Sequence, residues 1–88
     1  MKPYHLRRRI IEVRWQHFQG WAFCEKKQII AGSFWTKKDA IAEGADFCRG
    51  IKAHGGLAEL VIKNKDGEIG KGSGARRSYG KDPRSRRG

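Results

Sequence analysis

The residues best suited to binding chemistry surround a predicted helix start in the middle of the chain. Thr36 is placed to cap the helix, and Asp39 follows three residues later, as in a variant of the capping box. Lys37 and Lys38 lie between them, and groups at a helix N-terminus bind phosphate well. The lysine pair is therefore a candidate phosphate contact, with an ordinary solvated first turn as the alternative.

Trp35 immediately precedes this cap and has two interpretations. An exposed aromatic ring beside lysines can stack on a nucleobase or pack on a sugar while the lysines hold phosphates. Alternatively, Trp35 forms a hydrophobic staple by packing on Ala40 or Ile41. The sequence favours the staple.

Positive charge dominates the chain and is concentrated at its two ends. The 88 residues include 20 Lys and Arg against nine Asp and Glu, a net charge of +11. Residues 1–9 hold four basic residues and no acid, and residues 71–88 hold seven basic residues with Asp82 alone. Such a charge attracts polyanions. The candidate partners are DNA, RNA, an anionic membrane or an acidic protein, and a pair of solubilising tails is the alternative.

Other patterns that could carry chemistry fail on spacing. GEIGKGS (residues 67–73) does not meet the spacing of a phosphate-binding loop, since Gly72 stands where that loop needs Ser or Thr. The three His and two Cys show no metal-ligand spacing, and the few acids complete no catalytic set. We therefore expect no enzyme activity, no catalytic residue, no metal and no cofactor.

The sequence shows no apolar run of the length that a signal peptide or a membrane span requires. This predicts a cytoplasmic protein without a membrane partner, associated with the nucleoid if it binds DNA. Cys24 and Cys48 are then expected to be reduced, buried apolar residues.

The hydrophobic pattern predicts one small α+β domain. Strict alternation over residues 8–16 predicts a half-buried strand, and further strands are predicted at 21–25, 28–34 and 58–63. A helix follows the third strand and ends at glycines 55 and 56. The expected fold is a three-stranded antiparallel sheet packed on one helix and followed by a further strand (β-β-β-α-β), with one sheet face uncovered.

The expected boundaries follow from composition. Residues 1–7 are predicted to be a flexible basic N-terminus, residues 8–69 the domain, with an optional fifth strand at 68–69, and residues 70–88 a disordered tail rich in Gly and Arg. The aromatic residues expected in the core are Trp21, Phe23, Phe34 and Phe47.

Residues 21–88 resemble the domain-of-unknown-function family 2188, a family of small bacterial and phage domains. The shared segments are GWAF (20–23), Phe34, TKKDAI (36–41), AELVI (58–62), DGEI (66–69), SYGKDP (78–83) and Gly88. Two segments depart from the family pattern, RSRR (84–87) and the glycine-rich GKGSGARR (70–77), and both raise the positive charge. The resemblance implies a fold rather than an activity.

A looser resemblance links about 30 residues, from the W-x-F of the second strand through GSFWTKKDAIAE, to the arm-binding domain of phage-type integrases and the Apetala-type plant domain. Those modules lay a three-stranded sheet into the DNA major groove. The resemblance implies sheet contacts from Arg8, Arg14, Lys26, Lys27 and Gln28, and phosphate contacts from Lys37 and Lys38.

The sequence thus favours a basic nucleic-acid-binding domain that docks double-stranded DNA through its open sheet face. Trp35 is a further candidate contact, and the tail is expected to add sequence-independent phosphate contacts. The tail candidates are Arg76, Arg77, Arg84, Arg86 and Arg87.

Two alternatives stay open. One is a protein-interaction module of a phage or mobile element that binds a host protein through Trp15, Phe18 and Trp35. The other is an RNA-binding protein in which Tyr79 stacks on the bases of a flexible strand. The oligomeric state is open as well, with a monomer favoured.

Overall fold

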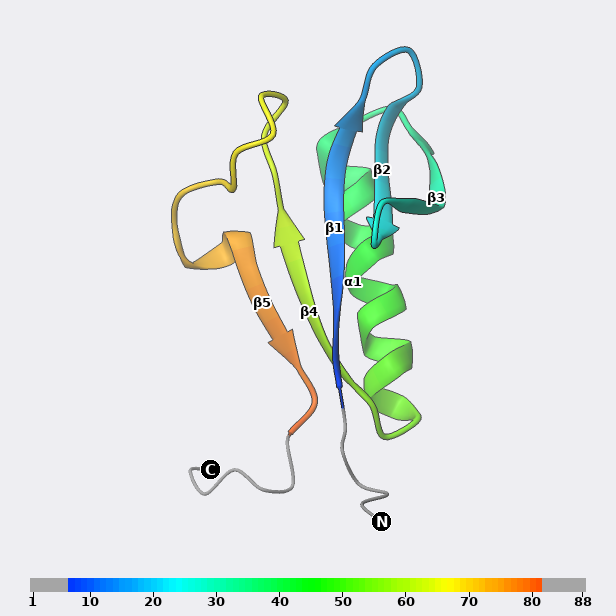
Figure 1. The fold of residues 1–88 in the computed structure, drawn as a ribbon, viewed down its shortest axis with the longest axis vertical. Coiled ribbons are helices and arrows are strands. Elements are labelled where there is room, and N and C mark those ends of the chain that lie inside the picture. Colours follow the sequence, from blue (N-terminus) through cyan, green and yellow to red (C-terminus); the bar gives the residue numbers. More distant parts are fainter. Residues whose placement is uncertain (1–6, 82–88) are drawn as a thin grey trace.

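The computed structural model describes residues 7–81, which form a sheet with one helix against one of its faces (Figure 1). Along the chain the elements are β1 (Arg8–Gln16), β2 (Gly20–Glu25), β3 (Gln28–Phe34), α1 (Lys37–Ala53), β4 (Leu57–Ile62), the 3-10 turn η1 (Ser73–Ala75) and β5 (Arg76–Tyr79). The predicted α+β class and its β-β-β-α-β order are confirmed, and a further strand is added.

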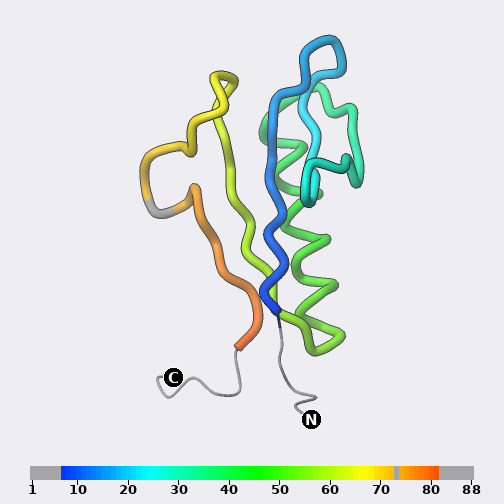
Figure 2. The backbone as a smooth tube through the Cα atoms, in the orientation of Figure 1, coloured from blue at the N-terminus to red at the C-terminus, as the bar shows by residue number. Residues whose placement is uncertain are grey.

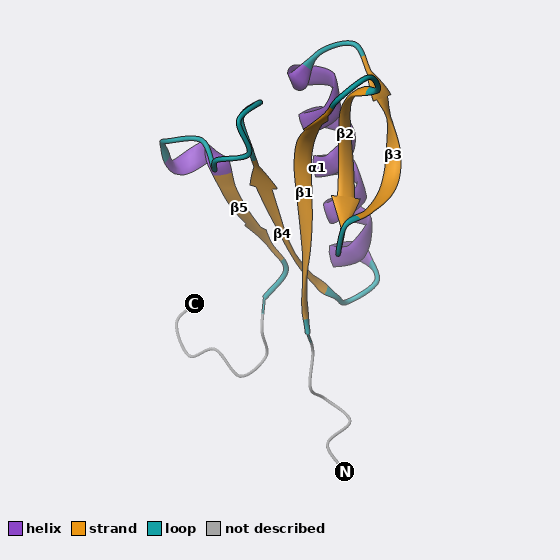
Figure 3. Cartoon of the chain, turned by 45° about the horizontal axis from the view of Figure 1, so that its top comes forward, coloured by secondary structure: helices purple, strands orange, loops and turns teal. Residues whose placement is uncertain are grey.

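β1 is the central strand of this five-stranded sheet, whose order is β3-β2-β1-β4-β5. It pairs antiparallel with β2 and parallel with β4. Parallel neighbours need a crossover connection, and α1 supplies it (Figure 3). The predicted three-stranded sheet, β1 to β3, is therefore part of a wider mixed sheet.

Alternation along β1 decides which face of the sheet is buried. Ile11 and Val13 are fully buried on the face that α1 covers, together with Leu60 of β4. The helix lies close to the sheet because its buried stripe has small residues. A Cβ atom added at Gly44 would lie only 3.1 Å from Leu60 Cδ1. The intervening residues of β1, at even positions, point to the opposite face, which no helix of residues 7–81 covers.

The predicted aromatic core is confirmed. Trp21 and Phe23 of β2 are buried, and Phe34 and Phe47 are partly buried and pack against the same cluster. The Phe23 ring lies 5.5 Å from that of Phe47 and 6.2 Å from that of Phe34, between centroids. Trp15 also packs against this cluster, 5.4 Å from Trp21 and nearly edge-on.

Local signals place the turns where the sequence predicts them. Lys26 and Lys27 form a two-residue hairpin connection with φ values of +50° and +68°, the backbone that such tight hairpins require. Asn64 and Gly67 close the turn after β4, where the Gly67 N–H donates to the Asn64 carbonyl. The Thr36 hydroxyl accepts the Asp39 N–H at 3.0 Å, so the predicted cap is confirmed.

The prediction of a disordered tail from residue 70 is wrong for residues 70–81. Arg76–Tyr79 form β5, which pairs antiparallel with β4, and Ala75 is buried. Tyr79 is half-buried against the core, so it does not stand on a flexible strand. The optional strand at 68–69 is reduced to a single bridge between Ile69 and Lys63. The parts of the predicted N-terminus and tail at residues 1–6 and 82–88 lie outside the described residues.

Removing β5 tests this correction. A chain that ends at Gly70 loses the pairing on β4 and the packing of Tyr79 and Ala75. Its free energy of unfolding in urea is expected to fall by about 2–4 kcal/mol. A chain that ends at Lys81 keeps every contact described here and should match the full chain. Equal urea midpoints for all three chains would show that β5 does not belong to the cooperative unit.

Candidate nucleic-acid interface

The open face of the sheet carries cations that acids on the same face partly neutralise. Arg14 and Lys63 approach Glu12 of β1, with N–O distances of 3.9 and 3.4 Å. Arg76 of β5 pairs with Glu59 of β4 at 3.2 Å. The predicted contact Arg14 is therefore on the expected face. Arg76, which was predicted to lie in a disordered tail, is on this face as well, and each of the two already has an acidic neighbour.

A denser group of cations gathers where β1 begins and β2 ends. Because these strands are antiparallel, the start of β1 lies beside the turn between β2 and β3. We define the basic end by these five residues: Arg7, Arg8, Arg9, Lys26 and Lys27. β5 also ends on this side of the sheet (Figure 2). The two strongly basic ends of the sequence therefore join the domain at one place.

Arg9 is held by the only ion pair that residues 7–81 form at the basic end. Its Nη2 and Nε donate to the two carboxylate oxygens of Glu25, at 2.7 and 3.0 Å. The hydrogen bonds that Arg9 donates to Glu25 lower the pKa of the Glu25 carboxyl, against the effect of burial, and raise the pKa of the Arg9 guanidinium. The guanidinium carbon also lies 5.6 Å from the centre of the Phe47 ring. Arg9 is thus a structural cation.

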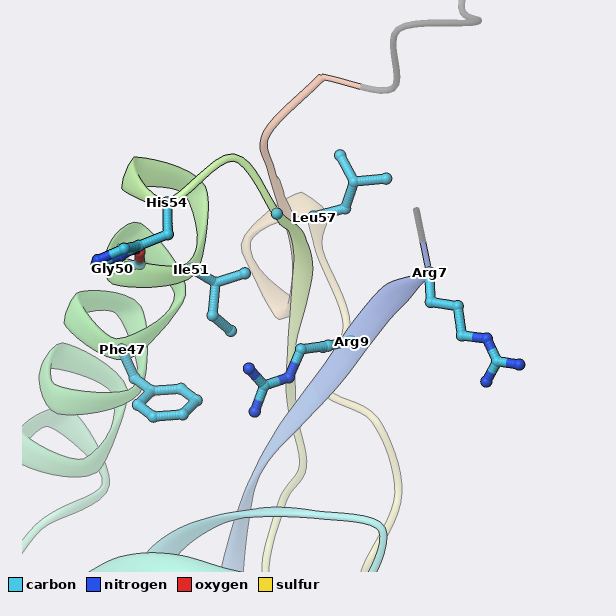
Figure 4. A pocket seen from close by; sticks show the side chains of 8 residues that line it. Arg7, Arg9, Phe47, Gly50, Ile51, His54 and Leu57 are labelled. Carbon is cyan, nitrogen blue, oxygen red and sulfur yellow. Dashed lines mark hydrogen bonds between the residues drawn. The ribbon is translucent and has the colours of Figure 1, made fainter. Parts of the chain in front are cut away.

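Two hollows flank the start of β1. On the helix side, Arg9 faces Phe47, Ile51 and His54 of α1 across a space of about 460 Å³, while the Arg7 side chain extends away from the helix (Figure 4). His54 Nδ1 lies within hydrogen-bonding distance of the Gly50 carbonyl oxygen, at 2.9 Å. This hollow is largely apolar on its helix side.

The second hollow, of about 390 Å³, lies on the open-face side and is more cationic. Arg7, Arg8 and Lys26 line it, along with the carboxylates of Glu12 and Glu25. Arg8 Nη1 donates to the Ala58 carbonyl at 3.1 Å, which fixes its guanidinium across β4 and leaves further N–H donors. Within residues 7–81, Arg7, Arg8 and Lys26 form no ion pair, so an anion placed here would meet unneutralised charge.

The opposite end of the same strands is rich in exposed aromatic rings. We define the aromatic end by Trp15, Phe18 and Trp35; the Phe18 and Trp35 side chains are each 94% exposed. The predicted staple of Trp35 is therefore wrong. With its side chain almost fully exposed, the indole does not pack on Ala40 or Ile41 as the staple requires.

The predicted lysine pair divides between two environments. Lys37 Nζ donates to Asn64 Oδ1 at 2.8 Å and lies 5.5 Å from the centre of the Trp21 ring. Lys38 is exposed to solvent. Lys65 approaches from the turn after β4, with its Nζ 4.3 Å from the centre of the Trp15 ring.

The structure thus separates the predicted contacts rather than joining them in one site. Arg8, Lys26 and Lys27 meet at the basic end, and Gln28 follows them as an exposed residue at the start of β3. Arg77 is turned from the open face, since it pairs with the inward-facing Leu60 and its Nε donates to the Gly74 carbonyl at 2.9 Å. Arg84, Arg86 and Arg87 lie outside the described residues.

Sequence reasoning missed two cations that matter for these surfaces. Lys63 reaches the open face because it continues the alternation of β4, which is a readable signal. Lys65 lies inside a strong turn sequence, and no local pattern indicates that it folds back over Trp15. Its position depends on the pairing of β1 with β4.

The two thiols have environments that oppose nucleophilic chemistry. Cys24 and Cys48 are buried, and burial raises both pKa values, that of Cys48 to about 11. The described part of the chain brings together no group of three metal-ligating side chains. None of its helices has the length and apolarity to cross a membrane.

Comparisons of the chain with known protein families, with characterised proteins and with solved structures give no match. The two resemblances noted from the sequence therefore stay predictions.

The ion pair at the basic end should make stability depend on pH. Since the pKa of Glu25 is lowered in the folded protein, its contribution is full above the unfolded pKa and is lost as the pH falls through the folded value. Arg9 is half exposed, so the pair is worth about 0.5–1 kcal/mol at pH 7. Glu25→Gln should lower the free energy of unfolding by that amount at pH 7.

Urea unfolding at several pH values checks this prediction. The difference between wild type and Glu25→Gln should shrink toward zero at about pH 3. Glu43→Gln is the control, because Glu43 is exposed and forms no ion pair with a described residue. A difference that persists unchanged in acid would mean that Glu25 acts by packing rather than by charge.

Proposed function

We propose that the protein binds nucleic acid, double-stranded DNA in the first instance, through phosphate contacts made by the basic end and the adjoining open face of the sheet. The observation that carries the proposal is the group of cations at the basic end that form no ion pair within residues 7–81: Arg7, Arg8, Lys26 and Lys27. Phosphate contacts position a protein on a duplex and supply most of its salt-dependent affinity.

The charge of the folded part supports a polyanionic partner. Residues 7–81 hold sixteen basic and eight acidic residues, and seven of these eight excess charges lie in residues 7–9 and 71–81, which include the ends of the sheet's strands β1 and β5. Arg8, Arg9, Arg76 and Arg77 all belong to strands. Cations held on a rigid sheet lose less conformational freedom on binding than cations on a free tail, which favours a defined contact surface.

The width of the sheet argues for contact with the DNA backbone rather than insertion of the whole face. Five strands spaced by about 4.8 Å span about 19 Å between the outer strands, whereas the major groove is about 12 Å wide. The integrase-like mode uses three strands, and here β1 lies in the middle of the sheet with β4 and β5 beyond it. The basic end, where the start of β1 lies beside the β2–β3 turn, is the part that best fits against phosphates.

Removing three exposed cations from the basic end tests the proposal. The variant Arg7→Gln/Lys26→Gln/Lys27→Gln should bind a short DNA duplex about 10-fold to 100-fold more weakly than wild type at moderate salt. The slope of log affinity against log salt should fall by up to about 3. Fluorescence anisotropy of a labelled duplex, titrated at several salt concentrations, measures both quantities.

The control removes the same charge elsewhere. Arg49→Gln/Lys52→Gln/Lys71→Gln changes three exposed cations on α1 and in the loop before η1. It should leave most of the affinity and the slope in place. Equal losses in the two variants would show that net charge alone attracts DNA and that the basic end is not a site. A chain ending at Lys81 reports separately on the contribution of Arg84, Arg86 and Arg87.

A further inference from the structure

We propose that the aromatic end is a second binding site, which stacks one unpaired nucleobase on Trp35 and holds the neighbouring phosphates of a single strand with lysines. The site lies at the end of the strands opposite to the basic end. The inference takes from the proposed function only the nature of the partner, nucleic acid, and adds the single-stranded form that this surface fits.

The exposure of Trp35 is the first observation. Large aromatic side chains contribute strongly to folding when buried, so an indole that is 94% exposed forgoes that contribution. Trp35 is not an isolated case, since Phe18 is equally exposed at the same end, in the turn between β1 and β2. Exposed aromatic rings gathered in one place mark interaction surfaces more often than single ones do.

The second observation is a hollow beside the Trp35 ring. It has a volume of about 410 Å³, and its aromatic walls are Trp15, Phe34 and Trp35, with Gln19 and Ser33 at polar positions. This size lies in the range of pockets that take small rings. Aromatic walls combined with an amide and a hydroxyl suit a planar heterocycle, whose faces are apolar and whose edge forms hydrogen bonds.

The third observation is the charge beside these rings. Lys37 and Lys65 are held over the rings of Trp21 and Trp15, and Lys37 is further fixed by Asn64. Neither these lysines nor Lys38 forms an ion pair with any residue of the range 7–81. Cations positioned beside an exposed stacking ring complement a chain of phosphates with unstacked bases.

The acids nearby form no ion pair with these lysines within residues 7–81. Asp39 donates its backbone N–H to the Thr36 hydroxyl, and its carboxylate is exposed. Asp66 Oδ1 accepts the Glu68 N–H at 2.9 Å within the turn after β4, where the Glu68 side chain is exposed as well. The three ammonium groups are therefore open to the phosphates of a ligand.

The geometry favours a single strand over a duplex. Bases within a duplex are stacked on one another, so their faces are closed to a protein ring, whereas an unpaired base can be splayed onto it. Phosphates on the lysines and a base on Trp35 use both features of the surface. A protein partner would use the rings but has no general need for three lysines.

The experiment compares two single strands of roughly eight nucleotides, an oligothymidylate and an abasic strand with the same phosphates. Wild type should bind the oligothymidylate more tightly, and the emission of the exposed Trp35 should be quenched on binding. Trp35→Ala should weaken binding of the oligothymidylate about 5-fold to 100-fold and leave the abasic strand unaffected. Trp35→Phe keeps a stacking ring and should retain most of the affinity.

Ile29→Ala is the control, because Ile29 is an exposed apolar residue of β3 that does not line the hollow and does not belong to the aromatic end. It should leave both affinities unaltered. Lys38→Gln/Lys65→Gln should weaken the two strands by the same factor, since it removes only phosphate contacts.

Three results would overturn the proposal. They are no effect of Trp35→Ala on the oligothymidylate, an equal effect on the abasic strand, or an equal loss in Ile29→Ala. Duplex binding by the basic-end variant is scored separately. If that variant binds duplex like wild type while the Trp35 effect persists, the proposed function fails and the base site stands. If that variant loses duplex affinity while Trp35→Ala has no effect on the oligothymidylate, the proposed function stands and the base site is rejected.

Discussion

The pairing of β1 with β4 is the constraint on which the rest of the structure depends. It turns a local three-stranded meander into a five-stranded mixed sheet and places the N-terminal strand in the middle. A central strand is hydrogen-bonded along both edges. Its inward-facing residues Ile11 and Val13 are fully buried beneath α1. The helix must cross the sheet for β4 to lie parallel to β1, and the small residues on its inner face allow it to do so at close range.

This arrangement also organises the charge. β4 runs parallel to β1 and antiparallel to β5, so β1 begins and β5 ends at the same end of the sheet. Basic residues that are far apart in sequence, in the segment before β1 and in the β2–β3 turn, become neighbours there. The acids of the open face, Glu12 and Glu59, moderate the charge at the centre of the sheet. The field is therefore strongest at one end.

The two ends of the sheet have different chemistry. The basic end presents guanidinium and ammonium groups around its open-face hollow, which suits phosphates. The aromatic end combines exposed rings with lysines fixed over other rings, which suits a flat heterocycle with phosphates beside it. Between them the buried thiols, with raised pKa values, contribute to packing rather than to reactivity.

The features that the sequence by itself determined are those encoded within a few neighbouring residues. The alternation of β1, the Thr36 cap, the Lys26–Lys27 hairpin and the turn at Asn64 each depend on local backbone and hydrogen-bonding preferences, and each forms as predicted. The predicted aromatic core follows in the same way, since the periodicity of a strand or helix decides which side chains share a face.

Only the tertiary structure decided the features that depend on distant neighbours. β5 has no strand signal of its own and exists because β4 offers an unpaired edge. Trp35 is exposed, although its place before the helix cap predicts a staple on Ala40 or Ile41. Lys65 lies over Trp15 because β4 runs beside β1. Strand order and side-chain exposure arise from contacts between segments far apart in sequence, and no pattern of nearest neighbours contains that information.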